Sequence, residues 1–410
     1  MDPATISVAA LAAAIALSCT TRINVGIVAV VLAWVVGVYG CGMKLEEILS
    51  GFPSQLFLTL TGVTLLFSLA QTNQTLDRVA QAAVTLCQGN RGVVPLLFFL
   101  LGAVLASAGP GNIATAALLA PVAMATGHRA GIPPFLMAIM VGNGCNAGSL
   151  SPLAPTGIIV NGIMARIGLG GRELLTWWNG FAVHGAVALA GYFAFGGWRL
   201  FRGATSVASV EAARLERRHW LTIAAITGVI AAVGLGGVNV GMAALGAASA
   251  LILSRAAAEE AAIRQMPWGV ILMVSGVTVL ISLVEKTQGI DLFASFVARV
   301  STPESATAVA ALLTGVVSVY SSTSGVVLPA FLPMVPGLVS RLPGADAYAV
   351  ATSMNVGGHL VDVSPLSTIG ALCIASVPDL HKEPWLFYKL LAWGLAMSVV
   401  GAAVCWLFFR

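Results

Sequence analysis

The sequence predicts an all-α polytopic membrane protein, built as an inverted repeat of two five-crossing halves, each with a re-entrant helical hairpin and a broken helix. Hydrophobic residues make up 58% of the 410 residues and charged residues only 9%, whereas a soluble domain carries about 25% charged residues. Apolar stretches near the ~20 residues that span a bilayer recur along the whole chain. The segments of the first half also recur in the second half in the same order.

Composition excludes several other classes of protein. The net charge of +4 is small and spread over the predicted loops, so we expect no nucleic-acid partner. The six cysteines show no CxxC spacing, which argues against a disulfide framework or a zinc site. We therefore expect the lipid bilayer as surroundings and no bound cofactor.

The first half, residues 1–198, precedes a polar linker. Three apolar spans are followed by a more polar helical stretch, a hairpin of two short apolar segments, a broken span and a long span. In chain order these are 5–20, 23–40, 54–71, 73–89, the hairpin 92–126, the broken helix 132–165, and 174–198.

The second half, residues 219–410, repeats this order after the linker 199–218. Its segments are 219–235, 238–254, 267–284, the polar stretch 286–301, the hairpin 304–340, the broken helix 345–376, and 385–409. The linker carries five arginines, which predict a cytoplasmic location: Arg199, Arg202, Arg214, Arg217 and Arg218. We expect a multi-pass protein of the cell inner (plasma) membrane.

Three short identities align the halves with nearly one offset, which makes chance similarity improbable. The first identity is Asn24-Val25-Gly26 with Asn239-Val240-Gly241. The second is Gly62-Val63-Thr64 with Gly276-Val277-Thr278. The third is Ser151-Pro152-Leu153 with Ser364-Pro365-Leu366.

The short hairpin segments set the topology. Segments of about 15 residues are too short to span comfortably, so each pair is expected to re-enter on the side it left. Each half then makes five full crossings, and an odd number inverts the second half relative to the first. One hairpin enters from each face of the membrane.

The broken helices carry the functional signal. The stretch from Gly142 to Pro155, GNGCNAGSLSPLAP, is predicted to hold no regular helix, since Gly costs about 1 kcal/mol and Pro about 3 kcal/mol in a helix. Irregular backbone at membrane depth survives only where protein buries it or water reaches it. Broken segments at matching places in two halves indicate a transporter's binding site. The alternative is a Gly-rich face for helix packing.

Polar residues of the hairpin tips and broken helices are the candidate ligands, because amides and hydroxyls can serve a carboxylate or a cation. The substrate-binding candidates are Asn112, Thr115, Asn143, Asn146, Ser151, Ser321, Ser322, Thr323, Ser324, Asn355, Ser364 and Thr368, with Ser367 beside them. The cation-binding or proton-coupling candidates are Ser149, Thr156, His359 and Asp362.

Asp362 is the sharpest single prediction, because a charge at membrane depth is costly and functional by default. Ser149 occupies the matching position in the first half, so the two sites differ. His359 lies three residues before Asp362 and is a candidate partner; the alternative is a purely structural Asp–His pair. His184 is predicted to be a hydrogen-bonded core histidine.

No Arg or Lys falls within either broken helix as bounded here. An anionic cargo would therefore be held by helix N-termini, amides, hydroxyls and a co-bound cation. This favours coupling to a sodium ion or a proton, with no metal beyond that ion.

The hairpin and broken-helix units resemble those of the MatC-like malonate/dicarboxylate carriers, within the ion transporter superfamily that includes the divalent-anion/sodium symporters. The tips here read Gly111-Asn112-Ile113-Ala114-Thr115 and Ser321-Ser322-Thr323-Ser324-Gly325. Neither has the Ser-Asn-Thr signature of the symporters. The resemblance implies an inverted repeat with two re-entrant hairpins and an elevator motion.

We therefore expect a secondary active transporter of a small carboxylate, malonate or another dicarboxylate, working by cation-coupled symport. An elevator needs a fixed scaffold, so we expect a homodimer through the first spans of each half. The alternatives are a cation/proton antiporter of the same superfamily and, less favoured, an intramembrane hydrolase. A hydrolase would need a Ser–His or paired-Asp arrangement, and no Gly-x-Ser-x-Gly motif is present.

Overall fold

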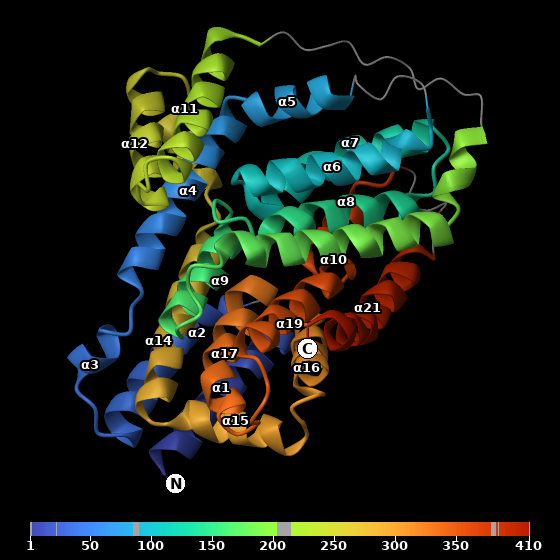
Figure 1. Cartoon of the computed structure of the whole chain (residues 1–410). Helices are drawn as coiled ribbons and strands as arrows, with labels where there is room; N and C mark the ends of the chain where they lie inside the picture. The colour runs from blue at the N-terminus through green and yellow to red at the C-terminus, as the bar shows by residue number, and fades with distance from the viewer. Residues whose placement is uncertain are drawn as a thin grey trace.

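The computed structural model describes residues 2–21, 23–84, 90–202, 215–378, 383 and 385–409. All regular elements within these residues are helices (Figure 1). Five helical stretches are long and apolar enough to cross a membrane, and one of them, Ala347–Ala375, contains the second broken helix. The predicted class, an all-helical membrane protein, is therefore confirmed. Residues 203–214 of the predicted linker, with Arg214, lie outside the described residues.

Within its described residues the first half contains ten α-helices, and all but α3 lie in the predicted places. They are α1 (Pro3–Thr20), α2 (Val25–Val35) with the π-helical η1 (Val36–Gly40), α3 (Leu45–Leu49), α4 (Ser54–Thr72), α5 (Thr75–Val84), α6 (Val93–Ala108), α7 (Gly111–Arg129), α8 (Pro134–Ser149), α9 (Pro155–Arg166) and α10 (Glu173–Ala194), followed by the 3-10 helix η3 (Gly197–Arg202).

The second half follows the same order. Its elements are α11 (Arg217–Gly234), α12 (Val240–Leu253), α13 (Glu259–Gln265), α14 (Trp268–Lys286), α15 (Gly289–Arg299), α16 (Ala306–Ser318), η4 (Thr323–Val327), α17 (Leu328–Phe331), η5 (Leu332–Met334), α18 (Val335–Val339), α19 (Ala347–Leu360), η6 (Val361–Val363), α20 (Thr368–Ala375) and α21 (Leu386–Phe408). The short helices α3 and α13 were not predicted, and they occupy matching places in the two halves.

Helices of one half pack against helices of the other: α2 contacts α14, and α4 contacts α12. Glycine makes both crossings possible. A Cβ on Gly26 would lie 2.3 Å from the carbonyl oxygen of Leu272, and one on Gly276 would lie 2.0 Å from that of Gly26. At the other crossing, a Cβ on Gly62 would lie 2.5 Å from the carbonyl oxygen of Gly241. Both backbones therefore approach as closely as small residues allow.

The same N-terminal cap starts the two helices at these crossings. The Oδ1 of Asn24 accepts the backbone N–H of Gly26 at 3.0 Å, and the Oδ1 of Asn239 accepts that of Gly241 at 3.0 Å. An Asn at the N-cap satisfies donors that a helix start leaves free. The repeated Asn-Val-Gly thus has a physical reason: one residue begins the helix and another lets it cross its partner.

The first hairpin consists of α6 and α7, which both run beside α8, and α8 also packs on α10 (Figure 1). Its tip turns at Gly109 and Gly111, which have φ of 142° and 77°, a region that disfavours residues with a Cβ. In the second hairpin, α16 packs on α19 and α21. The returning arm of this hairpin changes between π, α and 3-10 geometry and carries three prolines, which lack a backbone N–H: Pro329, Pro333 and Pro336.

The prediction that Gly142–Pro155 holds no regular helix was wrong for its first part. Helix α8 continues to Ser149, and the break covers only 150–154. Packing explains the difference: a Cβ on Gly144 would lie 2.4 Å from the carbonyl oxygen of Phe99, and one on Gly148 would lie 2.4 Å from that of Ala103. These glycines let α8 lie against α6, so tertiary contact overrides their low helix propensity.

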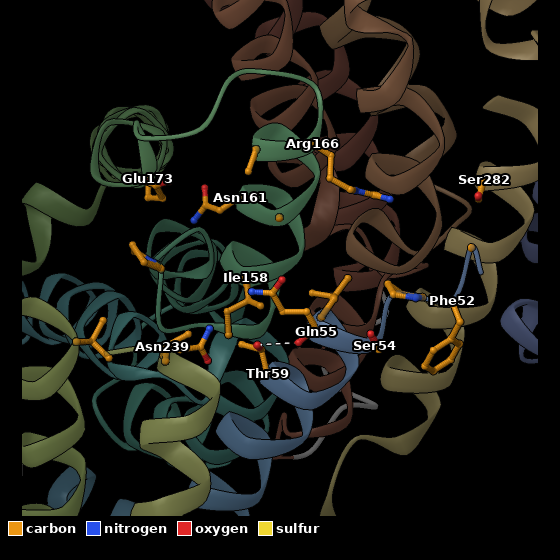
Figure 2. A pocket seen from close by; sticks show the side chains of 18 of the residues that line it. Phe52, Ser54, Gln55, Thr59, Ile158, Asn161, Arg166, Glu173, Asn239 and Ser282 are labelled. Atoms are coloured by element: carbon orange, nitrogen blue, oxygen red, sulfur yellow. Dashed lines mark hydrogen bonds between the residues drawn. The ribbon is translucent and has the colours of Figure 1, made fainter. Parts of the chain in front are cut away.

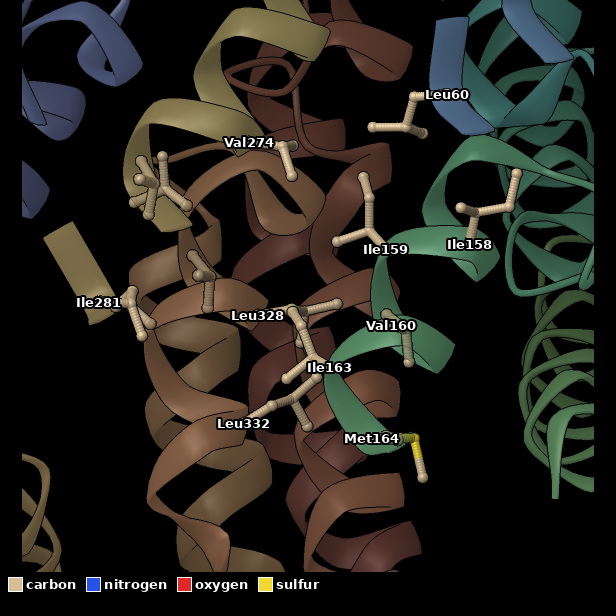
Figure 3. Close-up of a cluster of buried hydrophobic side chains, with 14 of the residues drawn as sticks. Leu60, Ile158, Ile159, Val160, Ile163, Met164, Val274, Ile281, Leu328 and Leu332 are labelled. Atoms are coloured by element: carbon tan, nitrogen blue, oxygen red, sulfur yellow. The ribbon is translucent and has the colours of Figure 1, made fainter. Parts of the chain in front are cut away.

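An apolar cluster joins the second part of the first broken helix to both halves (Figure 3). Ile159 and Ile163 of α9 meet Leu328 of α17 and Leu332 of η5, and all four side chains are no more than 1% exposed. Val274 and Ile281 of α14 and Leu60 of α4 belong to the same cluster. Its contacts are van der Waals contacts, the main packing force between helices in lipid.

Candidate functional site

A cavity of about 350 Å³ lies where the second hairpin tip meets the break of the second broken helix. We call it the tip cavity. It is lined by the end of α1 and the residues after it, both hairpin tips, Met273 of α14, and the break and start of α20. Its predicted polar lining residues are Asn112, Ser321, Ser322, Thr323, Ser324, Asp362, Ser367 and Thr368.

Asp362 is partly exposed at this cavity and is tied to the hairpin tip. The hydroxyl of Thr323 donates a hydrogen bond to Oδ1 of Asp362 at 2.7 Å. The Thr323 hydroxyl has two further neighbours. It lies against the hydroxyl of Ser318 and 3.3 Å from the carbonyl oxygen of Gly358. A hydrogen bond to a carboxylate is stronger than a neutral one, so this contact fixes where the acid faces the cavity.

The second hairpin tip is held from two sides. Within the tip, the Oγ of Ser322 accepts the N–H of Gly325 at 3.2 Å, which begins the π-helical turn η4. Outside it, the Oγ of Ser321 lies 2.8 Å from the Oγ of Ser18 at the end of α1. Sequence reasoning missed Ser18, because α1 reads as a uniform apolar span; the polar run Ser18-Cys19-Thr20-Thr21 at its end was the available signal.

The first hairpin tip reaches the same cavity through Asn112. Its Nδ2 donates to Oδ1 of Asn146 in α8 at 2.9 Å. The Nδ2 of Asn146 points on to the carbonyl oxygen of His359 in α19, at 3.3 Å. These two amides join the first tip to both broken helices, so residues some 34 and 213 positions apart come together beside one cavity.

The break in the second broken helix exposes its own polar groups. Helix α19 gives way to η6, and Ser364 is extended with ψ of 145° before Pro365. The hydroxyl of Ser367 bonds to the carbonyl oxygens of Ser364, at 2.8 Å, and of Asp362. It is also the N-cap of α20, where it accepts the N–H of Gly370 at 3.5 Å. Ser364 itself is buried, whereas Ser367 and Thr368 line the cavity.

Several predicted residues do not line the cavity and instead form hydrogen bonds with neighbouring groups. Asn143 pairs with Nδ1 of His184 at 3.0 Å and donates to the carbonyl oxygen of Ile139, which confirms His184 as a hydrogen-bonded core histidine. Ser149 donates to the carbonyl oxygen of Asn146, and Ser151 to that of Ser107, each at 2.7 Å. These hydroxyls hold the backbone of the first break.

Other predicted residues are buried with unused hydrogen-bonding atoms. The hydroxyl of Thr115, Oδ1 of Asn355 and Nε2 of His359 are buried without a partner, and Thr156 is 4% exposed. His359 bonds through Nδ1 to the carbonyl oxygen of Asn355 at 2.8 Å. The histidine therefore pairs within its own helix, and the Asp362–His359 pair suggested by the sequence is not formed in this structure.

A second and larger cavity, about 800 Å³, lies beside α9 (Figure 2). We call it the α9 cavity. It is lined by the loop before α4, the start of α4, helix α9 and the start of α12. Its polar residues include Gln55, Asn161, Arg166, Glu173 and Asn239. The sequence did not predict it, because the first broken helix was expected to end at 165 and so excluded Arg166.

Comparison with known proteins agrees with the predicted resemblance. Residues 1–149 match the family described as "Dicarboxylate carrier protein MatC N-terminus". No curated protein matches the sequence. Among solved structures, the chain is similar in fold to the Alcanivorax borkumensis YdaH transporter, whose crystal structure is described as having an unusual topology. The TM-score is 0.60 at 16% identity, over 91% of this chain and 88% of that chain.

The match over residues 1–149 covers the first hairpin and α8 up to Ser149. The structural likeness extends over nearly the whole chain. This chain thus shares the fold of a known transporter, and its first 149 residues match the N-terminal region of the MatC dicarboxylate carriers, the family that the sequence was predicted to resemble.

Proposed function

We propose that the protein is a secondary active transporter of a small dicarboxylate such as malonate, coupled to sodium ions or protons and working by an elevator motion. The observation that carries this proposal is the tip cavity, where Asn112 of one hairpin, Thr323 of the other and Asp362 of a broken helix meet. The MatC match over residues 1–149 supports a dicarboxylate as cargo.

The cavity's chemistry supports a coupled anion. Among the described residues that line it, none is Lys or Arg, and Asp362 adds a negative charge. A dicarboxylate brought beside a carboxylate would be repelled unless a cation were bound with it. Hydroxyl and carboxylate oxygens are ligands that hard cations accept. Binding of anion and cation is therefore expected to be mutually favourable, and the coupling is reciprocal by linkage.

The paired helix contacts support two equivalent repeats, 1–198 and 219–410, which we propose to be inverted and joined by a cytoplasmic linker. The contact of α2 with α14 has its counterpart in α12 with α4, and that of α1 with α15 in α11 with α5. Reciprocal contacts of this kind arise when two equivalent halves are related by a two-fold axis. Inverted repeats place their shared binding site near the middle of the bilayer.

The interface around α9 supports an elevator. Ile158 and Ile159 of α9 and Leu328 of α17 face Leu60 of α4 and Val274 of α14 in an apolar cluster (Figure 3). Van der Waals contacts have no fixed direction, so hairpins and broken helices could slide along α4 and α14 without breaking hydrogen bonds there. The scaffold would be a homodimer through the first spans of each half, in the cell inner membrane.

Two other functions are less well supported. A cation/proton antiporter would also use Asp362, but it would have no need for the hydroxyls and the Asn112 amide around it. An intramembrane hydrolase would need a base beside its nucleophile, and the free Nε2 of His359 forms no hydrogen bond with a hydroxyl group. The carrier remains the function that uses both hairpin tips.

Uptake of radiolabelled malonate into proteoliposomes tests the proposal. We expect accumulation driven by an inward sodium gradient or by an inward proton gradient, and none without a gradient. Cation flux measured in the same vesicles separates the antiporter: flux of sodium against protons without malonate would contradict the carrier. Equal uptake with and without either gradient would contradict the coupling.

A further inference from the structure

The α9 cavity contains an arginine that pairs with no carboxylate. Arg166 is exposed at the last position of α9, and the ion pairs of the described residues all involve other side chains. Figure 2 shows its side chain on the other side of α9 from Asn161, with the guanidinium pointing away from Glu173. Glu173 accepts the N–H of Gly171 at 2.9 Å. The charges of Arg166 and Glu285 of α14 interact, but the two side chains form no ion pair.

Three amide side chains line the same cavity with polar atoms to spare. The Nδ2 of Asn161 is buried without a hydrogen-bond partner. Asn239 uses its Oδ1 to cap α12, and its Nδ2 is left for the cavity. Gln55 of α4 lines the cavity as well. Gln55 and Asn239 are exposed, whereas the Nδ2 atom of Asn161 is buried. Buried polar groups are normally satisfied, so the unpaired Asn161 donor in a cavity that also contains a guanidinium indicates a place suited to an oxygen-rich anion.

Comparison of the two halves shows that this arrangement is particular to the first broken helix. Asn24 is the first-half counterpart of Asn239, and its Nδ2 is committed: it donates to the carbonyl oxygen of Gly269 at 2.8 Å and ties α2 to α14. The matching carbonyl, that of Gln55, is instead taken by the hydroxyl of Thr59 at 2.9 Å. Asn239 therefore remains free, and the gap between α12 and α4 is part of a cavity about twice the volume of the tip cavity.

We propose that the α9 cavity is a second carboxylate-binding site, in which Arg166 pairs with one carboxylate of the anion and the amides of Asn161 and Asn239 donate to its remaining oxygens. A guanidinium matches a carboxylate with two parallel hydrogen bonds. The site is distinct from the tip cavity and shares no lining residue with it. Only the choice of a dicarboxylate as the anion rests on the proposed function.

The site can be tested without transport. Ser54 lines the α9 cavity at the start of α4, so Ser54→Cys, in a chain whose native cysteines are replaced, gives a reporter for a fluorescent maleimide. Purified protein in nonionic detergent exposes both sides. Malonate should slow labelling in a saturable way, and malonamide, its neutral analogue, should not.

Substitution at Arg166 then decides the proposal. Arg166→Gln should raise the malonate concentration for half protection by tenfold or more, because a hydrogen bond to a charged group contributes about 1.5–3 kcal/mol. Arg166→Lys keeps the charge without the bidentate geometry and should give an intermediate value. Arg341→Gln is the matched control: Arg341 is exposed, paired with Asp291 at 3.3 Å, and should leave protection unchanged.

A further arm separates this site from the proposed transport site. Asp362→Asn should retain malonate protection at Ser54→Cys even if it loses uptake, so failure of one proposal does not imply failure of the other. Equal protection in the wild type and in Arg166→Gln would overturn the second site. So would protection by a short-chain phosphatidylglycerol with none by malonate, because Arg166 would then be a headgroup anchor.

Discussion

At the scale of single residues, the hydrogen bond from Thr323 to Asp362 is the contact that gives the tip cavity its chemistry. It links an acid of a broken helix to the tip of a hairpin over 2.7 Å. Ser149 takes the matching position of the first half and is fully buried. Among the described residues that line it, the cavity therefore has one acid and not two, and changes at that acid and its hydroxyl partner are the most informative.

Asp362→Asn should abolish gradient-driven malonate uptake while the protein remains folded, because the amide keeps the volume but cannot carry the charge that attracts a cation. Proteoliposome uptake and monodisperse elution in detergent measure the two effects. Asp291→Asn, a change of the same kind at an exposed acid paired with Arg341, is the control. Normal uptake by Asp362→Asn would remove Asp362 from the mechanism.

Thr323→Val should lower the rate of malonate uptake at limiting substrate by about tenfold or more, since a hydrogen bond to a charged partner contributes about 1.5–3 kcal/mol. Thr323→Ser should restore most of it, because it keeps the hydroxyl that reaches Asp362. Initial rates at several sodium concentrations provide the measurement. If Ser and Val behaved alike, the hydroxyl would have no part in transport.

At the scale of helices, close backbone approach explains more of the glycine pattern than helix breaking does. Gly144 and Gly148 lie inside α8 and pack on α6. Gly357 packs on the backbone of Ala311, where a Cβ would lie 2.2 Å from the Ala311 carbonyl oxygen. Glycine at Gly109 and Gly111 serves the other purpose, a turn with positive φ. The same residue type thus packs helices in one place and ends them a few residues away.

Gly276→Ala should destabilise the fold, because its methyl group would lie 2.0 Å from the carbonyl oxygen of Gly26. The backbone of α2 at Gly26 would have to move to relieve this clash. Overpacking of this kind costs about 1–3 kcal/mol. Gly246→Ala in α12 is the matched control, since nothing lies within 4 Å of the place its methyl group would take. The midpoint of thermal unfolding in detergent should fall for the first variant and hold or rise for the second.

At the scale of the whole molecule, the contact between Ser18 and Ser321 joins α1 to the second hairpin tip at 2.8 Å. In an elevator this pair would separate in every cycle, because α1 belongs to the proposed scaffold and Ser321 to the moving part. A covalent bond between positions 18 and 321 would hold the molecule in the arrangement of this structure.

Ser18→Cys with Ser321→Cys, in a chain without native cysteines, should form a disulfide on oxidation, since the two hydroxyl oxygens already lie 2.8 Å apart and a disulfide needs Cβ atoms about 3.5–4.5 Å apart. Uptake should stop on oxidation and return with a reductant. Each single cysteine variant is the control. A cross-linked protein that still transports would contradict the elevator.

Much of this architecture could be predicted from sequence because membrane burial leaves strong marks. A charge such as Asp362 is easily recognised in an apolar stretch, and the hairpins are predicted because their apolar segments are too short to span a bilayer. The features that the sequence did not predict depend on tertiary contacts. The local sequence does not indicate that Gly144 packs on Phe99 or that Ser18 contacts Ser321. It also does not indicate that α9 extends one residue beyond the predicted end at 165 and brings Arg166 to a cavity.

The single acid of the tip cavity has an electrical consequence. If the cavity travels through the bilayer with Asp362 ionised and nothing bound, the empty carrier moves one negative charge on its return. The transmembrane voltage acts on that step with about 2.3 kcal/mol per charge per 100 mV. The resting potential would then help set how fast the carrier resets, even when the loaded carrier is neutral.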